Sequence, residues 1–125
     1  IGSPHASISE CRNFVKFLNG KSCNTNVQTI ITIGRDVLSA AKNEGIVDQL
    51  KGAGVQVLSD ICWCSITEPV LPVEASVIMT NSGKYAHYAG GLTGRAIRFG
   101  SLKDCAQTAQ SGFAKSDLPD WLINL

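Results

Sequence analysis

Residues 27–58, VQTIITIGRDVLSAAKNEGIVDQLKGAGVQVL, decide the fold of this protein. They open on a short run of apolar and β-branched residues, 27–32, which predicts a strand. Apolar side chains then recur with helical spacing over 34–43 and 46–52, and a second apolar run over 55–58 predicts another strand. Two strands joined through helices form a βαβ unit, in which the strands are parallel.

A capped helix precedes this unit. Ser7 and Glu10 stand three residues apart, which is the spacing of a capping box. Apolar side chains then recur every three or four residues, so we expect a helix over 8–19. Asn19 and Gly20 are typical of a helix end.

Two further apolar runs, 76–80 and 96–99, predict a third and a fourth strand. Ser101 then caps a last helix. Its apolar face consists of Leu102, Cys105, Ala109 and Phe113. Because the strands are short apolar runs without alternation, we expect them to be buried on both faces, as in a parallel sheet covered by helices. The sequence therefore predicts one small three-layer α/β domain over 1–115, with a roughly four-stranded, mainly parallel sheet, and a tail over 116–125 that leads out of it.

The composition excludes several classes of protein. Hydrophobic residues make up 44% of the 125 residues and charged residues 17%, which is too apolar a balance for a disordered chain. The net charge of +1 provides no basic surface for nucleic acid. No apolar run reaches the roughly 18–20 residues of a membrane span. The chain starts at Ile1 without a signal peptide, and we expect it to be a piece of a longer protein.

The five cysteines do not form the pattern of a disulfide-rich secreted protein, so we expect a reducing compartment, the cytoplasm. Cys11 and Cys105 lie on apolar helix faces and are expected in the core. Cys62 lies just past the end of a strand, and with Cys64 it forms a C-x-C pair. A zinc or iron–sulfur site needs three or four ligands at known spacings. The pattern alone therefore favours a buried cysteine at a strand end.

Ligands of a parallel α/β sheet bind outside the carboxyl ends of its strands. The stretch NSGKYAHY, residues 81–88, begins at one of these ends. Ser82 and Lys84 provide a hydroxyl and a positive charge beside the free N–H groups of a helix start, which suits a carboxylate or a phosphate. The surrounding residues do not match a Walker A loop. A turn with a solvated lysine explains the same residues without a ligand, and His87 is interpreted as a structural hydrogen-bonding residue.

His5 and Ser7 stand before the first helix, at another helix N-terminus that favours anions. Ser7 has a structural role as the N-cap residue. His5 has no structural role that the sequence identifies, which favours a functional one. With two histidines and no G-x-S-x-G motif, the chain shows no catalytic set of a hydrolase. The arginines are interpreted as surface charges or carboxylate clamps; those considered are Arg35, Arg95 and Arg98.

Four stretches together resemble the large subunit of aconitase X, in the aconitase superfamily. They are PHASxxE at 4–10, DxC at 60–62, MTNSGKYAHY at 79–88 and FGSLxDC at 99–105. The third is long enough to be specific, and the order and spacing of all four resemble the C-terminal third of that subunit, over about residues 1–112. The resemblance implies a flavodoxin-like α/β domain, as in the aconitases.

The resemblance also implies an activity. Members of the superfamily are dehydratases, hydro-lyases that remove water from small hydroxy acids with an iron or iron–sulfur centre as Lewis acid. Two activities are associated with this family, dehydration of cis-3-hydroxy-L-proline and of mevalonate 5-phosphate, and we expect the first. The implied partners are the remaining domains of the large subunit and a swivelling small subunit or fused segment, which supplies a serine for acid–base chemistry. The isolated chain holds no candidate base and is expected to be inactive.

Individual residues carry over from the resemblance by position. Cys62 matches a metal ligand of the family. Ser82 and Lys84 match residues near the substrate carboxylate. His5 and Ser7 match the turn at the active-site cleft, so the resemblance implies that these four residues bind substrate.

One position departs from the family pattern. Many members have another cysteine ligand before Pro-His, where this chain has Ser3. The remaining ligands then come from elsewhere in the enzyme, the centre is of a different type, or this branch has lost it. A second function also stays open, that of a stand-alone flavodoxin-like module that binds an anion or a partner without catalysis.

Overall fold

The computed structural model describes residues 1–114 and Leu122. The elements follow the chain in the order α1 (Ile8–Leu18), β1 (Thr29–Ile33), α2 (Arg35–Asn43), α3 (Ile46–Gly52), β2 (Val55–Ser59), η1 (Trp63–Ser65), β3 (Val77–Thr80), α4 (Gly83–Thr93), β4 (Ala96–Phe99) and α5 (Leu102–Ser111). The helices and strands predicted from the sequence are all present. The predicted tail over 116–125 lies outside the described residues, Leu122 apart.

β1 and β2 form the predicted βαβ unit. They pair in parallel along their whole length, with Ile31 opposite Val57, and α2 and α3 make the connection. Every residue of β1 is buried. Ile31 and Ile33 belong to one apolar cluster, whereas Ile30 belongs to another. Because successive side chains of a strand point to opposite faces, β1 is covered on both faces, as predicted.

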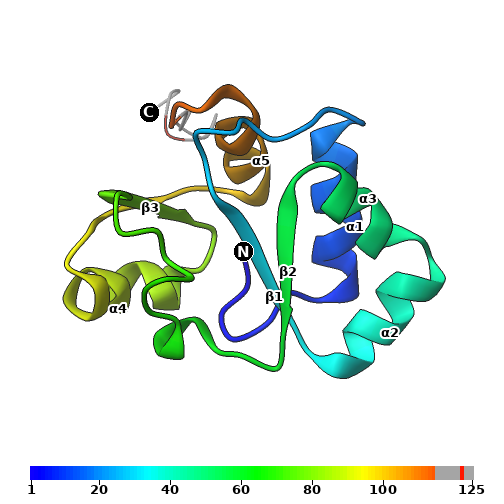
Figure 1. The fold of residues 1–125 in the computed structure, drawn as a ribbon, viewed down its shortest axis with the longest axis horizontal. Coiled ribbons are helices and arrows are strands. Elements are labelled where there is room, and N and C mark those ends of the chain that lie inside the picture. Colours follow the sequence, from blue (N-terminus) through cyan, green and yellow to red (C-terminus); the bar gives the residue numbers. More distant parts are fainter. Residues whose placement is uncertain (115–121, 123–125) are drawn as a thin grey trace.

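β3 and β4 also pair in parallel, with Ile78 opposite Ile97. In the described part of the chain they form a separate sheet, whereas the sequence predicted a single sheet of about four strands. The N-terminal segment lies along the free edge of β1. The amine of Ile1 donates to the carbonyl oxygen of Ile30 (2.8 Å), and the carbonyl of Ile1 accepts from the N–H group of Thr32 (2.9 Å). Ile1 thus occupies the edge of β1 that faces β3, and Figure 1 shows the N-terminus between the two sheets.

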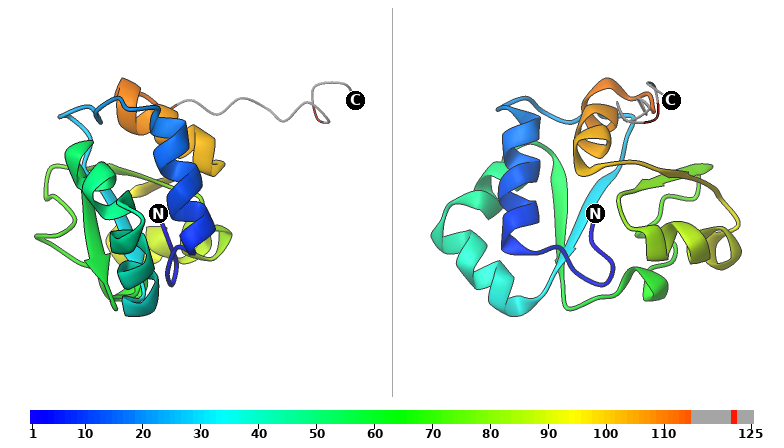
Figure 2. Two further views of the ribbon diagram at one scale, coloured as in Figure 1. Left: turned by 90° about the vertical axis from the view of Figure 1, so that its right-hand side faces the viewer. Right: turned by 180° about the vertical axis from the view of Figure 1, so that it is seen from behind.

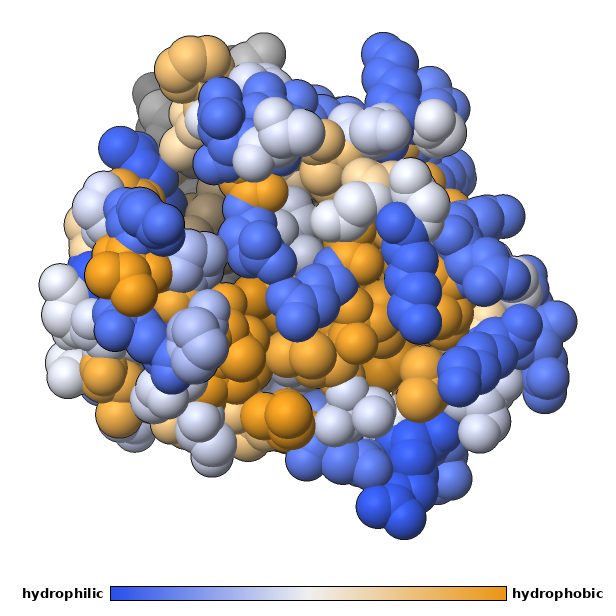
Figure 3. All heavy atoms as spheres, viewed as in Figure 1, coloured by the Kyte–Doolittle hydropathy of each residue, from blue (hydrophilic) through white to orange (hydrophobic). Residues whose placement is uncertain are grey.

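Two apolar cores hold the elements together. The first packs α1, α3 and α5 on β1 and β2, with Phe14 and Leu50 among its fully buried members. The second joins α4, β3 and β4 to the loop that contains η1, through Trp63 and Tyr85. α1 packs against both α3 and α5, and Figure 2 shows α1 and α5 from two sides. On the face seen in Figure 1, apolar side chains gather across the middle and hydrophilic ones surround them (Figure 3).

Side-chain caps define the helix ends. The hydroxyl oxygen of Ser7 accepts from the N–H group of Glu10 (3.1 Å), and the Ser7 hydroxyl lies 3.3 Å from the Glu10 carboxylate. Ser101 makes a complete capping box in α5. Gly112 ends this helix in the left-handed conformation, so Phe113, predicted on its apolar face, lies beyond the helix and is 76% exposed. Within the residues described, no helix has both the length and the apolar character needed to cross a bilayer.

Candidate functional site

An ion pair joins the carboxyl ends of β1 and β2. Asp60 follows β2 directly and has a φ of 59°, a left-handed conformation that aspartate tolerates better than most residues. One of its carboxylate oxygens accepts from the backbone N–H group of Arg35 (3.1 Å), and the other accepts from Nε of Arg35 (2.9 Å). Arg35 is the first residue of α2, and the N-cap residue Gly34 has no capping side chain. The carboxylate of Asp60 therefore caps α2 from the neighbouring strand.

We expect Asp60→Ala to lower the free energy of unfolding by about 2 kcal/mol, because it removes the cap and places alanine in a left-handed conformation. Asp60→Asn is the matched control, since asparagine keeps an acceptor oxygen and tolerates this conformation. We expect Asp60→Asn to lower the free energy of unfolding by less than half as much, as measured by urea denaturation. Equal losses would mean that the charge of Asp60, and not its cap, stabilises the fold.

His5 and Ser7 lie at the same edge of the first sheet. An open cavity of about 470 Å³ there is lined by His5, Ala6, Ser7, Gly34, Arg35, Asp36, Val37 and Asp60. The N-cap residues of α1 and α2, Ser7 and Gly34, both line it, so the cavity lies beside two helix N-termini. The Ser7 hydroxyl caps α1, whereas the His5 side chain is exposed. The structure thus brings two predicted site residues together and places Arg35 and Asp60 beside them.

The polar turn after β3 starts α4. Ser82 is the N-cap residue, and its hydroxyl oxygen accepts from the N–H group of Tyr85 (3.2 Å), while its own N–H group donates to Oγ1 of Thr80 (3.1 Å). Asn81 has a buried side-chain oxygen without a hydrogen-bond partner among the described residues. Lys84 is exposed in the first turn. A cation at this place faces the positive end of the helix dipole, which disfavours it unless an anion binds there.

Cys62 and Cys64 lie on either side of Trp63 at η1. Cys62 is half-buried and Cys64 is exposed. The ring of Trp63 lies 5.4 Å from that of Tyr85, whose hydroxyl is buried without a hydrogen-bond partner among the described residues. Burial is the main cause that raises the pKa of Tyr85, and the nearby Cys64 raises it further. No three His, Cys, Asp or Glu side chains of the described part form a group that could hold a metal. These residues alone therefore do not fit an iron–sulfur cluster, which needs three or four ligands.

The two core cysteines are expected to be unreactive. Burial raises the pKa of Cys11 and of Cys105 to about 11. Alkylating reagents attack the thiolate, so at pH 8 only about one in a thousand of these groups is reactive, and this fraction rises as the pH approaches the pKa. We expect iodoacetamide at pH 8 to modify the exposed Cys64, and Cys11 and Cys105 only after unfolding in urea. Peptide mass spectrometry measures this, and equal rates for Cys11 and Cys64 in the folded protein would contradict it.

Two residues have roles other than those predicted. Arg95 is a structural residue, because its side chain is 10% exposed and donates to the carbonyl oxygen of Ala75 (2.7 Å) and the carboxylate of Glu68 (3.0 Å). These partners lie 20 and 27 residues away along the chain, so no local pattern signals the contact. His87, predicted to be a structural hydrogen-bonding residue, is exposed, and its ring packs edge-on against that of Tyr88 at 4.8 Å.

Parallel strands with polar turns at their carboxyl ends define the class of protein, an α/β domain of the kind that carries ligand sites at this edge. The family model described as the aconitase X third domain matches residues 1–111. The chain belongs to this family, which confirms the resemblance read from its motifs.

The relatives are dehydratases. The chain is 40% identical over 122 residues to the cis-3-hydroxy-L-proline dehydratase of Hypocrea jecorina and 39% identical over 122 residues to that of Pseudomonas aeruginosa. It is 35% identical over 96 residues to the phosphomevalonate dehydratase large subunit of Methanothermobacter thermautotrophicus. These alignments cover 98%, 98% and 75% of this chain but 20%, 21% and 23% of the relatives. The chain thus spans about a fifth of the length of the curated relatives it matches.

A solved structure shares the fold. The crystal structure of Thermococcus kodakaraensis aconitase X in its holo form matches with a TM-score of 0.70 and 26% identity. The match covers 85% of this chain and 26% of that one. The α/β fold class predicted from the sequence is therefore confirmed.

Proposed function

We propose that this chain is the third domain of a hydro-lyase that dehydrates cis-3-hydroxy-L-proline. The observation that carries the proposal is the identity of 39–40% over 98% of the chain to two dehydratases named for this substrate. Identity to four phosphomevalonate dehydratase large subunits is 25–37% over 70–90% of the chain. Dehydration of mevalonate 5-phosphate is the second candidate function, because these four relatives support it.

In this proposal the N-terminus of α4 binds the substrate carboxylate. Lys84 supplies a positive charge, and the hydroxyl of Ser82 keeps its proton available for donation while its oxygen caps the helix. The first N–H groups of α4 have no acceptor within the helix, so they add donors beside Lys84. His5 and Ser7 contact the substrate from the turn before α1, where they line the cavity at the carboxyl ends of β1 and β2.

Cys62 is proposed as one ligand of an iron or iron–sulfur centre whose other ligands lie elsewhere in the longer protein. The support is a free, half-buried thiol just past the end of β2. In the full-length protein we expect Cys62→Ser to lose most of its iron, since loss of a thiolate ligand weakens binding strongly. Cys64→Ser is the matched control and keeps its iron. Unchanged iron content in Cys62→Ser, measured by metal analysis of the purified protein, would remove Cys62 from the ligands.

The rest of the catalyst is proposed to come from the remaining domains and from a swivelling small subunit or fused segment, which supplies the acid–base group. All five cysteines are free thiols. Free thiols support a cytoplasmic location for the complete enzyme, because disulfides are rare in reducing compartments.

The experiment that tests this function compares the full-length protein with the 125-residue chain. Each is incubated with cis-3-hydroxy-L-proline, and loss of water is followed by mass spectrometry of the product. We expect turnover by the full-length protein and none by the chain alone, because the chain supplies substrate contacts without the acid–base group. No turnover by the iron-loaded full-length protein would contradict the proposal. Equal turnover by the chain alone would contradict the division of the site among domains.

A further inference from the structure

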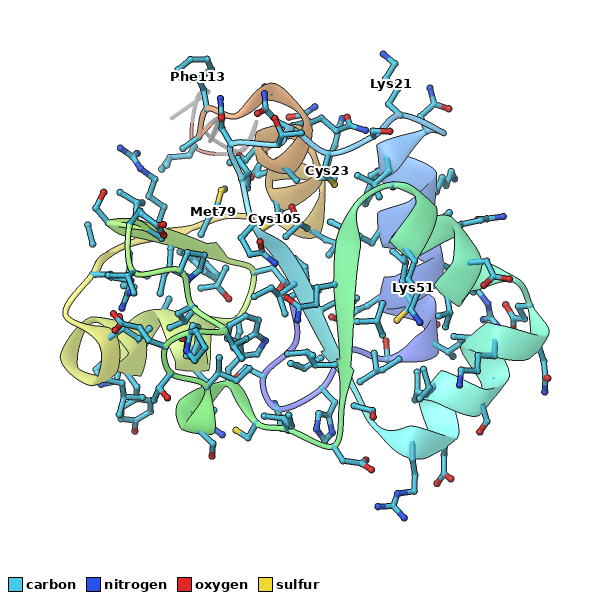
Figure 4. All side chains as sticks on the ribbon, in the orientation of Figure 1. Lys21, Cys23, Lys51, Met79, Cys105 and Phe113 are labelled. Atoms are coloured by element: carbon cyan, nitrogen blue, oxygen red, sulfur yellow. The ribbon has the colours of Figure 1, made fainter. Side chains whose placement is uncertain are left out.

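A groove separates the two sheets. It has a volume of about 510 Å³, and it is lined on one side by Thr29 and Ile30 of β1 and on the other by Val77 and Met79 of β3. Met79 of β3 and Cys105 of α5, both labelled in Figure 4, also line this groove and belong to the same apolar cluster. The groove is therefore bordered by the facing edges of two strands.

Ile1 already occupies one position of a strand in this groove. Its amine donates to the carbonyl oxygen of Ile30, and its carbonyl accepts from the N–H group of Thr32. In a parallel pair of strands, a residue bonds to the carbonyl group just before its opposite residue and to the N–H group just after it. Ile1 bonds to Ile30 and Thr32 in this way, so it lies opposite Ile31. The chain leaves this line at the next residue, Gly2, with a φ of +100°. A Cβ atom there would lie 2.8 Å from the carbonyl oxygen of Thr32, so only glycine fits.

The backbone edges on both sides of the groove face each other. In a strand, the N–H and C=O groups of one residue point to the same side, and those of the next residue point to the opposite side. The carbonyl of Ile30 accepts from Ile1, so the N–H group of Ile30 faces the groove as well. In β3, the carbonyl oxygens of Ser76 and Thr80 accept from residues at the ends of β4. The backbone groups of the alternate residues Val77 and Met79 therefore face the groove. A strand between the two edges would pair with both.

Burial at the start of Ile1 supports the same conclusion. Ile1 is 9% exposed, and burial lowers the pKa of its amine to about 6. A peptide N–H group at this place makes the same hydrogen bond to Ile30 without the cost of a buried charge. The hydroxyl of Tyr85, which also lines the groove, is buried and has no partner among the described residues. A backbone segment in the groove offers it one.

We propose that the residues immediately before Ile1 in the longer protein form a strand that fills this groove, parallel to β1. The chain spans about a fifth of the length of its relatives, so a longer protein has further residues from which this strand can come. The two sheets then become one sheet with the order β2, β1, new strand, β3, β4. Figure 1 agrees, because the strand direction turns progressively from β2 through β1 to β3, as in one twisted sheet.

The new strand would bring together the turns that follow the carboxyl ends of the two present sheets. In this sheet β1 and β2 follow the new strand on one of its sides, and the chain then crosses to β3 and β4 on its other side. The direction in which successive strands are added therefore reverses between the new strand and β3. In open α/β sheets this switch point forms the ligand crevice. The turn over 2–5 and the turn at Ser82 then follow neighbouring strands. This inference does not depend on which reaction the enzyme catalyses.

Residue-resolved hydrogen exchange on the full-length protein tests the strand. The amides of Ile31 and Ile78 face β2 and β4 and are the internal controls, whereas those of Ile30 and Met79 face the groove. We expect all four to be protected, with Ile30 and Met79 exchanging no more than about 100-fold faster than their neighbours. A larger difference for Ile30 and Met79 would show open strand edges and overturn the proposal.

Cysteine cross-linking tests which segment fills the groove and in which register. With Ile1 opposite Ile31, the second residue before Ile1 lies opposite Thr29. In the full-length protein, with Cys23→Ser to remove the thiol that contacts the Thr29 side chain, we expect Thr29→Cys to form a disulfide with a cysteine placed at that second residue. A cysteine placed directly before Ile1 points to the opposite face and is the matched control. Protected groove amides without the expected disulfide would mean that another segment fills the groove, which overturns the proposal.

Discussion

Replacing Lys84 by alanine in the full-length protein is expected to lower kcat/KM for cis-3-hydroxy-L-proline by about 10- to 100-fold. A hydrogen bond between a charged donor and a carboxylate contributes about 1.5–3 kcal/mol, which corresponds to this factor. Lys84 is exposed in the first turn of α4, where the helix dipole disfavours a cation. The free energy of unfolding should therefore not fall. Steady-state kinetics and urea denaturation of the same variant separate the two effects.

Lys103 provides a matched control for Lys84. It is the second residue of α5 and follows the N-cap residue Ser101, just as Lys84 is the second residue of α4 and follows Ser82. Both lysines are exposed. Lys103→Ala is expected to leave kcat/KM unchanged, and Lys84→Arg to retain part of it. A normal kcat/KM in Lys84→Ala would remove Lys84 from the substrate site.

Arg95→Ala is expected to lower the free energy of unfolding by about 3 kcal/mol. The guanidinium of Arg95 donates to the carbonyl oxygens of Pro72, Ala75 and Thr93 and to the carboxylate of Glu68, at 2.7–3.1 Å. Truncation leaves carbonyl groups of this partly buried loop without a donor, and each such group costs about 1–3 kcal/mol. Urea denaturation measures the loss. The variant also tests whether the loop between β2 and β3 depends on this one side chain.

Arg12 is the control for Arg95. It also pairs with a carboxylate, that of Glu44, but its side chain is 51% exposed. Exposed ion pairs contribute little to stability, so Arg12→Ala should have a small effect. Arg95→Lys keeps the charge but loses the planar set of donors, and should fall between wild type and Arg95→Ala. Equal stability of Arg95→Ala and Arg12→Ala would contradict the structural role of Arg95.

The helices could be predicted from the sequence because their signals are local. Ser7 and Ser101 accept hydrogen bonds from N–H groups three residues ahead, which is the spacing that the sequence shows. The error at Phe113 has a local cause as well. Its apolar side chain continues the spacing of α5, but Gly112 adopts the left-handed conformation and ends the helix first.

The sheet could not be predicted to the same extent, because its contacts are distant in sequence. Apolar runs identify the strands and favour parallel pairing, but they carry no information that Ile1 lies on the edge of β1, 29 residues from its hydrogen-bond partner Ile30. The position of Ile1 between the two sheets was therefore not predictable from local patterns.

The turns that carry the candidate site residues could be placed from the sequence, whereas some contacts of these turns could not. The general preference for the carboxyl ends of parallel strands located the turns at Cys62 and Ser82, whereas His5 was singled out by its place before a helix N-terminus. The pairing of Asp60 with Arg35, 25 residues apart, was not predictable because it depends on how β1 and β2 lie side by side. The pattern around Cys62 favoured a buried cysteine, whereas the structure leaves it half-buried.

The measurement that tests the central claim most directly is the ratio of two kcat/KM values for the full-length protein. One is for cis-3-hydroxy-L-proline and the other is for mevalonate 5-phosphate, measured on the same iron-loaded preparation. The proposed function predicts a ratio of at least about 100 in favour of cis-3-hydroxy-L-proline, since a site built for one substrate's polar groups discriminates strongly against another. A higher kcat/KM for mevalonate 5-phosphate would contradict it and assign the protein to the second candidate function.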